Sequence, residues 1–190
     1  MSIGLIVTLA VVGVALLYGM LIYNGLVNLK HAVSKAWSNI DVLLKQRHDE
    51  LPKLVEVCKQ YMGFEKDTLE RVTAARSAVF AARERADVSQ VGAAEGLLRA
   101  GLGNLFALAE SYPELKADQQ FKHLRDRISQ IENAIADRRE LYNDSVNLNN
   151  VRIEQFPDLI VARLFGFGAR PLLEFSAEET RDLDLRQLFN

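Results

Sequence analysis

The chain has 190 residues, of which 49% are apolar and 25% charged, and its formal net charge is −2. This size and composition fit one globular domain with its own core, and the nearly balanced charge gives no reason to expect nucleic acid as a partner. The single cysteine, Cys58, excludes an internal disulfide. Only four prolines are present, so the elements are expected to be long helices.

The first 29 residues form an apolar segment that carries no Asp, Glu, Lys, Arg or His. Its central part, IGLIVTLAVVGVALLYGMLIY, is long enough to cross a bilayer as a helix. Tyr18 and Tyr23 near one end are typical of an aromatic belt at a membrane interface. A cleaved signal peptide would have a basic start and a shorter apolar stretch, and a buried core helix would have a polar face. We therefore predict that residues 1–29 are an uncleaved transmembrane anchor.

The orientation of this anchor follows from the charges next to it. Lys30, Lys35 and Lys45 come soon after the apolar segment, and no charged side chain precedes it. The positive-inside rule then predicts a cytoplasmic C-terminal part and an N-terminus outside.

Beyond the anchor, apolar residues follow alternating steps of three and four, with Arg47 in the one polar slot. This pattern predicts a long helix with a narrow packing seam that continues from the anchor without a break. We expect a kink at Pro52, because the seam keeps its register through it; the alternative is a break, with Pro52 in the first turn of a new helix. The seam consists of Val33, Trp37, Ile40, Leu44, Leu51, Leu54, Cys58 and Tyr61, and the same register extends to Val72, Ala75, Val79 and Ala82.

A second helix is predicted from about Val88 to Glu110. Tyr112-Pro113 should follow its end, because the residue before a proline avoids the α region. Gly92 and Gly96 have the spacing that lets two helices approach closely, a motif best established in membranes. The alternative is a loosely formed helix whose small residues face a crowded neighbour.

A third helix is predicted to begin near Ala117, with Arg138 in the polar slot of its apolar stripe. After Tyr142 the stripe shifts by one residue, which resembles a stutter in a coiled coil. The stripe consists of Phe121, Leu124, Ile128, Ile131, Ile135 and Tyr142, followed by Val146, Asn149, Ile153 and Phe156. Pro157 marks its end. The apolar stretch that follows is expected to pack on the bundle as a short helix, and contact with the bilayer is the alternative.

These elements predict an all-α fold: an elongated up-and-down antiparallel bundle of three long helices and a short C-terminal one, with an N-terminal transmembrane helix. The predicted domains are the anchor at 1–29, the long-helix bundle at 30–157, and the short apolar helix with a C-terminal tail at 158–190. In this arrangement the first and third long helices run in the same direction.

Two segments share the pattern Y-N-x-x-V-N: YNGLVN at 23–28 and YNDSVN at 142–147. Because the first and third helices are expected to run in the same direction, the two segments should not lie level, and each is expected to act locally. The alternative is a stacked assembly or a different chain reversal that brings the two segments together. Tyr23 and Asn24 are expected at the membrane interface, in contact with lipid headgroups or water.

Asparagines are concentrated around the second of these segments. Asn149 lies on the apolar stripe, where a buried asparagine fixes register and oligomer state. Asn143, which follows Tyr142, is a candidate for the same role, and solvent exposure of Asn143 and Asn147 is the alternative.

Taken together, several segments resemble the LemA family of bacterial membrane proteins. They are YNGLVNLKHAVSKAWSNIDVLLKQRHDELPKLVEVCKQY, FEKDTLERVTAAR, ESYPELKAD, IENAIADRRELYNDSVNLNN and EQFPDLIVARLFGF. They are specific as a set and reach to about Phe175. The resemblance implies a single-pass protein of the bacterial inner membrane with an up-and-down helical bundle. It implies no shared enzymatic activity, and relatives include a magnetosome-associated protein. Leu148 departs from the family pattern, in which a second Tyr is common there, and the Asn-rich 147–150 is unusual.

The sequence suggests no catalytic, cofactor-binding or metal-binding residue, so we do not expect an enzyme. Paired E-x-x-H motifs, G-x-S-x-G, a P-loop and C-x-x-C are missing from it. His48 stands beside carboxylates in RHDE, but adjacent residues of a helix point in different directions, so a solvated charge cluster is expected. Cys58 is expected to be a small buried hydrophobe.

Several charges fall on or beside the apolar stripes. A buried charge needs a partner, so we expect cross-helix pairs between Arg47 and Glu132 and between Glu110 and Arg139 that specify packing. The alternative is a binding patch for a partner protein. The charges on the stripes are Arg47, Glu65 and Arg138, and those that flank them are Glu110, Glu132 and Arg139.

The function expected from these features is that of a membrane-anchored scaffold that self-associates and has no catalytic activity. The heptad seam and two pairs of small residues, Ala15 with Gly19 and Gly92 with Gly96, motivate the self-association. The expected partners are the lipid bilayer and further copies of the chain. The alternative is an adaptor that recruits or regulates another membrane or envelope protein.

Overall fold

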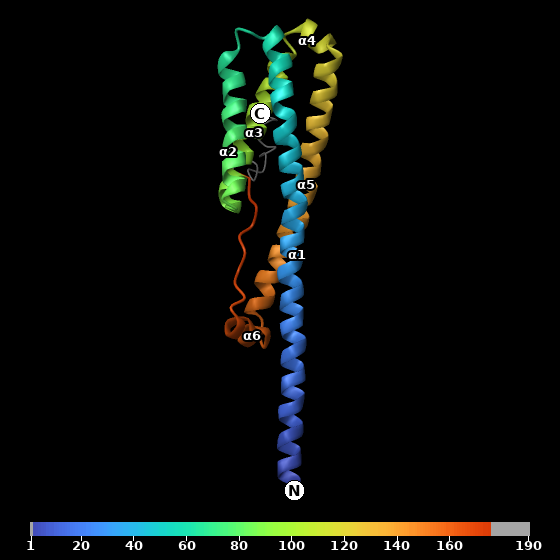
Figure 1. Ribbon diagram of the computed structural model, residues 1–190, viewed down its shortest axis with the longest axis vertical. Coiled ribbons are helices and arrows are strands. Elements are labelled where there is room, and N and C mark those ends of the chain that lie inside the picture. The colour runs from blue at the N-terminus through green and yellow to red at the C-terminus, as the bar shows by residue number, and fades with distance from the viewer. Residues whose placement is uncertain (1, 176–190) are drawn as a thin grey trace, which may run out of the picture. The chain divides into compact units, whose positions relative to one another are not determined.

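The computed structural model describes residues 2–175, which form six α-helices (Figure 1). The predicted all-α class is confirmed, but this part of the chain has four long helices where three were expected. The helices are α1 (Ile3–Tyr61), α2 (Lys66–Glu84), α3 (Val88–Ala109), α4 (Pro113–Ala117), α5 (Gln119–Glu154) and α6 (Asp158–Phe165). The part of the predicted C-terminal tail beyond Phe175 lies outside the described residues.

The chain divides into two compact units. Unit 1 comprises residues 2–38 and 140–171, and unit 2 comprises residues 39–139 and 172–175. Both α1 and α5 contribute one part to each unit. The domain boundaries predicted after residues 29 and 157 fall inside unit 1 and stay predictions.

Helix α1 runs without a break through Pro52. The alternative in which a new helix begins at Pro52 is therefore wrong. A proline inside a helix removes one backbone hydrogen bond and costs about 3 kcal/mol or more. Leu51 and Leu54, on the same turns of α1, are fully buried, and burial of each leucine contributes about 1.5–3 kcal/mol. The packing of this turn therefore offsets the effect of the proline.

The expected continuation of this helix to Ala82 is wrong, because the chain turns back after Tyr61. Residues 62–65 connect α1 to α2, and the Glu65 N–H donates to the carbonyl of Met62 over 3.0 Å. Met62 is buried and Phe64 is fully exposed. The apolar spacing persists across this turn, so the pattern showed which residues of α2 face the core but not that the chain reverses.

The added reversal makes α1 and α5 antiparallel within unit 2. The Tyr61 hydroxyl, at the end of α1, donates to Asp118 Oδ2 over 3.1 Å, just before α5 begins. Asp118 Oδ1 accepts from the Phe121 N–H over 2.7 Å and so caps α5. Four helical segments, from α1, α2, α3 and α5, thus form an up-and-down bundle in unit 2 (Figure 1).

The connections between the helices of unit 2 contain a residue with positive φ, a capping aspartate and a proline. Ala86 has φ 53° between α2 and α3, and Asp87 caps α3 by accepting from the Gln90 N–H over 3.0 Å. Helix α3 ends at Ala109, before the Tyr-Pro pair as expected, and Pro113 occupies the first turn of α4, a short helix that was not predicted.

Gly92 accommodates an extended segment instead of the neighbouring helix that its spacing with Gly96 suggested. A Cβ atom at Gly92 would lie 2.0 Å from the carbonyl oxygen of Glu174. Residues 172–175 thereby lie against α3, with Leu173 and Phe175 buried.

The stripe of α5 changes phase earlier than expected. Ile135 and Tyr142 are buried, but Arg138 is exposed and Arg139 is half-buried. The slot assigned to Arg138 is thus occupied by Arg139, and the shift lies before Tyr142. Phe156, assigned to the end of the stripe, is exposed.

Unit 1 is built from the N-terminal part of α1, the C-terminal part of α5, and α6. Trp37 of α1 and Tyr142 of α5 have ring centroids 5.6 Å apart. Helix α6 ends at Gly166, whose φ of 71° is the left-handed conformation that glycine adopts readily. A small core cluster joins the three helices through Ile22, Leu26, Ile153 and Ala162, with Val161 and Phe167 packed against it.

Candidate functional site

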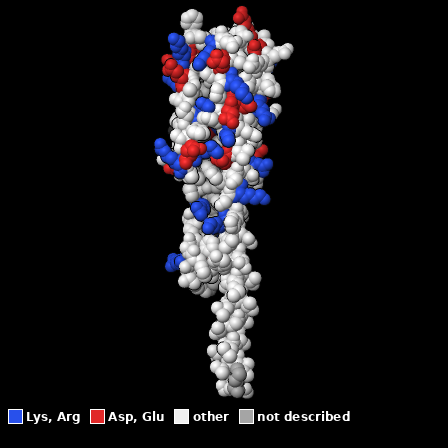
Figure 2. Space-filling view, in the orientation of Figure 1, with Lys and Arg blue, Asp and Glu red and all other residues white. Residues whose placement is uncertain are grey.

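The N-terminal third of α1 exposes an apolar surface in unit 1. Nearly every side chain from residue 3 to residue 21 is exposed, and this end of α1 carries no charged side chain (Figure 2). Among residues 2–175, α1 alone is long and apolar enough to cross a membrane, by length and composition. An exposed apolar surface of this length marks a region that another apolar phase is expected to cover.

Helix α6 adds a second apolar surface beside this part of α1. Ala162 is buried against α1, whereas Ile160, Leu164 and Phe165 are exposed. At the start of α6, Asp158 is buried and accepts from the Nε of Arg152 over 2.9 Å. The helix therefore packs on unit 1 with one side and presents leucine, isoleucine and phenylalanine with the other.

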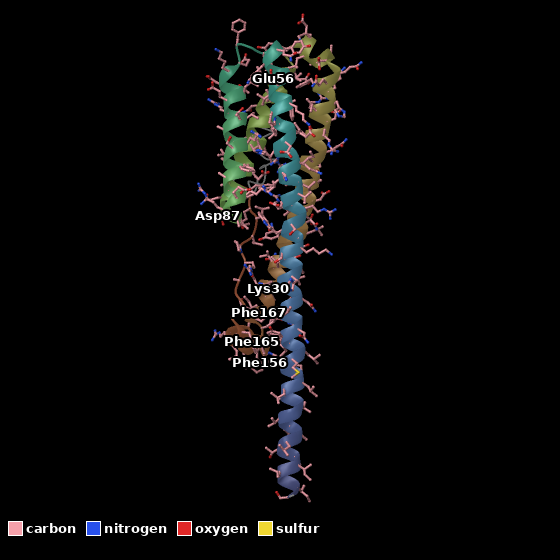
Figure 3. All side chains as sticks on the ribbon, viewed as in Figure 1. Lys30, Glu56, Asp87, Phe156, Phe165 and Phe167 are labelled. Atoms are coloured by element: carbon pink, nitrogen blue, oxygen red, sulfur yellow. The ribbon has the colours of Figure 1, made fainter. Side chains whose placement is uncertain are left out.

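Tyr23 holds the end of α6 through ring contacts. Its ring centroid lies 4.8 Å from that of Phe165 and 5.7 Å from that of Phe167, both edge-on. Edge-to-face pairs of this kind contribute about 0.5–1.5 kcal/mol beyond the burial of area. In Figure 3, Phe165 and Phe167 lie beside α1, with Lys30 farther from its N-terminus.

The segment after α6 is held to α5 by two neighbouring asparagines, a contact that we name the amide clasp. Asn150 Nδ2 donates to the carbonyl of Arg170 over 2.9 Å, and the Arg170 N–H donates to Asn150 Oδ1 over 2.8 Å. Asn149 Nδ2 donates to the carbonyl of Gly168 over 3.3 Å. The Tyr142 hydroxyl donates to the carbonyl of Pro171 over 3.0 Å. Side-chain amides thus pair with backbone that no sheet partner satisfies.

This geometry gives the buried asparagine a role that the sequence did not suggest. Asn149 is buried, as its place on the stripe indicated, but its amide binds a segment of the same chain. Asn143 is half-buried and Asn147 is exposed. The use of Asn149 to fix an oligomer stays a prediction.

The two Tyr-Asn segments occupy different places in unit 1. Tyr142 is buried beside Trp37, and Tyr23 contacts the end of α6. Asn24 is exposed. The premise that the two helices run in the same direction is wrong, although each tyrosine does have its own local contacts.

Two adjoining pockets lie where α1 meets α6 and the amide clasp. The apolar pocket has a volume of about 510 Å³ and the basic pocket about 330 Å³. Tyr23 and Phe165 line both. The apolar pocket is otherwise lined by Ala15, Leu16, Gly19, Met20, Asn24, Val161 and Leu164, and the basic pocket by Val27, Lys30, His31, Asn149, Gly166, Phe167, Gly168 and Arg170.

In unit 2, a buried ion cluster joins three helices. Arg47 of α1 has 1% of its surface exposed and forms a hydrogen-bonded ion pair with Glu95 of α3, which is 0% exposed. Arg47 Nη1 lies 3.7 Å from Glu132 Oε1 of α5, the partner suggested by the stripes. Burial raises the pKa of Glu132, and the nearby Arg47 and Arg99 oppose that effect. That this cluster specifies how the helices pack stays a prediction.

Glu95 was not predicted from the sequence, although a signal was available. In α3 the buried residues Val91, Leu98, Leu102 and Leu105 follow steps of three and four, and Glu95 fills their polar slot. It is the counterpart of Arg47 in α1.

The other charged candidates have partners different from those expected. Glu65 Oε1 accepts from the Tyr112 hydroxyl over 3.1 Å. Glu110 is exposed and pairs with Lys116, so its predicted pair with Arg139 is wrong. The guanidinium of Arg139 lies 4.0 Å from the ring centroid of Phe175, a cation–π contact.

The solvated cluster expected at residues 47–50 is found only in part, because Asp49 is exposed but Arg47 is buried and His48 is half-buried. Its ring stacks on Phe80 with 4.6 Å between centroids, and its Nε2 lies 2.7 Å from Nη2 of Arg76. Burial, followed by the charge of Arg76, lowers the pKa of His48. Cys58 is fully buried, and burial raises the pKa of its thiol to about 12. In the described part of the chain, no group of three or more His, Cys, Asp or Glu residues is placed to hold a metal ion.

The sequence of this chain is similar to those of a known protein family and of three characterised relatives. The family model described as "LemA family" matches residues 36–185. The chain is 24% identical over 168 residues to magnetosome protein MamQ of Magnetospirillum gryphiswaldense, and 23% identical over 168 residues to magnetosome proteins MamQ 1 and MamQ 2 of Paramagnetospirillum magneticum. Each match covers 76% of this chain, which spans 62% of the length of these relatives.

Proposed function

Since the chain belongs to the LemA family, we propose that it is a membrane-anchored helical scaffold without catalytic activity. One observation supports this proposal above the others: α1 is a single helix that begins as an exposed apolar segment and ends inside the buried core of unit 2. The similarity to magnetosome proteins supports a membrane association. The burial of Arg47 against Glu95 and Glu132 supports a structural use of the strongest charge cluster.

We further propose the bacterial inner membrane as the location, with the N-terminus outside and unit 2 in the cytoplasm. The lysines that follow the apolar segment support this orientation. A cysteine at Gly63, in a background in which Cys58 is replaced by serine, tests it. In intact cells a membrane-impermeant maleimide should leave this cysteine unlabelled and should label it after lysis. Labelling in intact cells would overturn the proposed orientation.

The scaffold is proposed to self-associate through an exposed stripe on α5. Leu141, Leu148 and Val151 are exposed large hydrophobic residues at helical spacings of seven and three. This spacing is typical of a seam between helices. A second copy of the same stripe would cover it.

The mass of the detergent-solubilised full chain, measured by light scattering, tests self-association. We expect an oligomer for the wild type and a monomer for L148K/V151K. The matched control is L97K, which replaces an exposed leucine of α3 outside the stripe. A monomeric wild type would refute self-association, and unchanged oligomers in L148K/V151K would exclude this stripe as the interface.

An adaptor role is the second candidate, and Phe64 is the observation that favours it. This phenylalanine is fully exposed in the turn between α1 and α2. Crosslinking and affinity purification of the wild type and F64S distinguish the two functions. A second membrane protein captured in stoichiometric amounts by the wild type and lost in F64S supports the adaptor, whereas capture of further copies of the chain alone supports the scaffold.

A further inference from the structure

We propose that the basic pocket and the apolar pocket of unit 1 together bind one anionic glycerophospholipid, with its phosphate in the basic pocket and an acyl chain in the apolar pocket. This inference rests on the membrane anchorage proposed above and adds a lipid class and a binding site to it.

The basic pocket has the charge that a phosphate group requires. Lys30 and Arg170 line it from α1 and from the segment after α6, together with His31. None of its lining residues, all within the described part, is an Asp or Glu. Neither Lys30 nor Arg170 forms a side-chain ion pair with another residue of 2–175. Two cations without a carboxylate favour a ligand with net negative charge.

The backbone that presents Arg170 is fixed before any ligand binds. Asn150 bonds both the N–H and the carbonyl of Arg170, and Asn149 bonds the carbonyl of Gly168. A preorganised segment loses less conformational entropy on binding than a mobile one. The amide clasp therefore fixes the backbone position from which the exposed Arg170 side chain extends, in the pocket that Lys30 also lines.

The apolar pocket supplies the matching site for a hydrocarbon chain. Its lining is apolar apart from Asn24 and the hydroxyl of Tyr23, and it opens along residues 15–24 of α1. Tyr23 and Phe165 form the shared wall with the basic pocket. Gly19 and Lys30 are about 16 Å apart along α1, at about 1.5 Å per residue. This spacing separates an acyl-chain site from a headgroup site, as in an amphiphile.

The position on α1 favours a lipid over a soluble phosphate ester. Lys30 is the first charged side chain after the apolar segment, and Tyr23 precedes it by two turns. Tyrosine and lysine at the end of a membrane span lie at the depth of the headgroups. A ligand that enters both pockets from this depth must have a polar and an apolar end.

Native mass spectrometry of the full chain, released from detergent after incubation with phosphatidylglycerol or phosphatidylcholine, tests the proposal. The wild type should retain phosphatidylglycerol in preference to phosphatidylcholine. K30Q/R170Q should retain about ten- to thirtyfold less phosphatidylglycerol, because each lost cation at an anionic surface corresponds to about 1 kcal/mol. The matched control is K35Q/R163Q, which removes two exposed cations of the same unit outside both pockets and should bind as the wild type does.

The apolar pocket has its own pair of variants. A Cβ atom at Gly19 or at Gly13 would meet no atom within 4 Å, but Gly19 lines the apolar pocket and Gly13 does not. G19L should therefore reduce retention of phosphatidylglycerol, and G13L should not. Circular dichroism spectra that match the wild type confirm that the variants fold.

Three results would overturn the proposal. They are equal retention of the two lipids by the wild type, equal loss in K30Q/R170Q and K35Q/R163Q, and displacement of the lipid by equimolar glycerol phosphate, which would assign the pocket to soluble phosphate esters. Flotation with phosphatidylcholine vesicles separates this failure from that of the anchorage. A chain that floats without preferring phosphatidylglycerol is anchored but lacks the site, and a chain that does not float refutes the anchorage itself.

Discussion

The two units stabilise their polar interiors by different means. Unit 2 buries full charges: within residues 2–175, Arg47 pairs with the carboxylates of Glu95 and Glu132. Unit 1 pairs its buried carboxylate, Asp158, with Arg152, but it holds the segment after α6 with neutral groups, since Asn149 and Asn150 bind the backbone of that segment. The difference follows from the partners: in unit 2 the polar groups join helices to one another, and in unit 1 they join a helix to an extended segment. Charges orient whole helices in a bundle, whereas side-chain amides match the spacing of backbone N–H and carbonyl groups.

A buried polar residue on a helical stripe thus has two distinct uses in this chain. In unit 2 the polar slots of two stripes, Arg47 and Glu95, face each other across helices. In unit 1 the slot of Asn149 faces a non-helical segment that lies far along the chain. Loss of an ionic slot should thus affect the whole bundle, and loss of an amide slot should affect one segment.

Removal of the cation from unit 2 should have the largest effect. R47M leaves Glu95 and Glu132 buried without their shared partner, so the free energy of unfolding should fall by about 3–5 kcal/mol. Urea unfolding of the full chain in detergent, followed by helical circular dichroism, measures this change. K53M removes the exposed Lys53–Glu50 pair and serves as control, with an expected loss below about 0.5 kcal/mol. Equal stability of R47M and the wild type would show that the ion cluster does not hold unit 2 together.

Displacement of the extended segment from unit 2 should rank second. In G92A the new Cβ would overlap the carbonyl oxygen of Glu174, so residues 172–175 must move and expose Leu173 and Phe175. The loss of their burial should lower the free energy of unfolding by about 2–4 kcal/mol. G103A is the control: its Cβ meets nothing within 4 Å, and it should gain up to about 1 kcal/mol from helix propensity. Similar unfolding curves for G92A and G103A would contradict the packing described for Gly92.

Loss of one clasp residue in unit 1 should have a smaller and local effect. N150A removes both hydrogen bonds to the backbone of Arg170, which are together worth about 1–2 kcal/mol. Hydrogen exchange of the Arg170 amide should accelerate about tenfold or more, with no change in the core of unit 2. N147A, an exposed asparagine on the same helix, should leave this exchange unaltered. Acceleration throughout the chain would mean that the amide clasp does not act locally.

The smallest expected effect is a dependence of stability on pH in unit 2. The pKa of His48 lies below 6.5 in the folded chain, so the unfolded chain binds a proton at mildly acidic pH that the folded chain does not. The free energy of unfolding should therefore rise as the pH rises from the folded pKa through about 6.5. H48Q should show a smaller rise than the wild type between about pH 5 and pH 7 in detergent. Parallel curves for the two chains would exclude this contribution of His48.

The sequence predicted what depends on local spacing and missed what depends on distant contacts. The seam of α1 was correct at Ile40, Leu44 and Leu51, because steps of three and four report directly which side of a helix is buried. The turn after Tyr61 was missed because the spacing survives it, although Gly63 was a signal for a break.

The exchange of Arg138 for Arg139 has a similar origin. Between Ile135 and Tyr142 either arginine satisfies a step of three or four. Extension of the stripe backward from Asn149 and Val146 selects Arg139. The prediction followed the stripe forward from Ile135 and therefore chose Arg138. The structure shows that Arg139 is the more buried of the two arginines.

Most of the candidate site could not be predicted. The segment after α6 has no periodic pattern, so neither its contact with Asn150 nor the pocket beneath Arg170 follows from spacing. Tyr23 was expected at an interface, but its ring partners Phe165 and Phe167 depend on the left-handed turn at Gly166. Such contacts depend on tertiary structure that a stripe does not encode.

Because the amide clasp is made of neutral side chains, its hydrogen bonds should depend little on the pH and salt concentration around it. An anionic leaflet attracts protons and cations, so the solution at its surface is more acidic and more saline than bulk water. A carboxylate clamp there would gain protons and lose its grip, and an ion pair would be screened. Asn149 and Asn150 neither titrate nor carry charge, so their hold on Gly168 and Arg170 would persist across changes in acidity and salt.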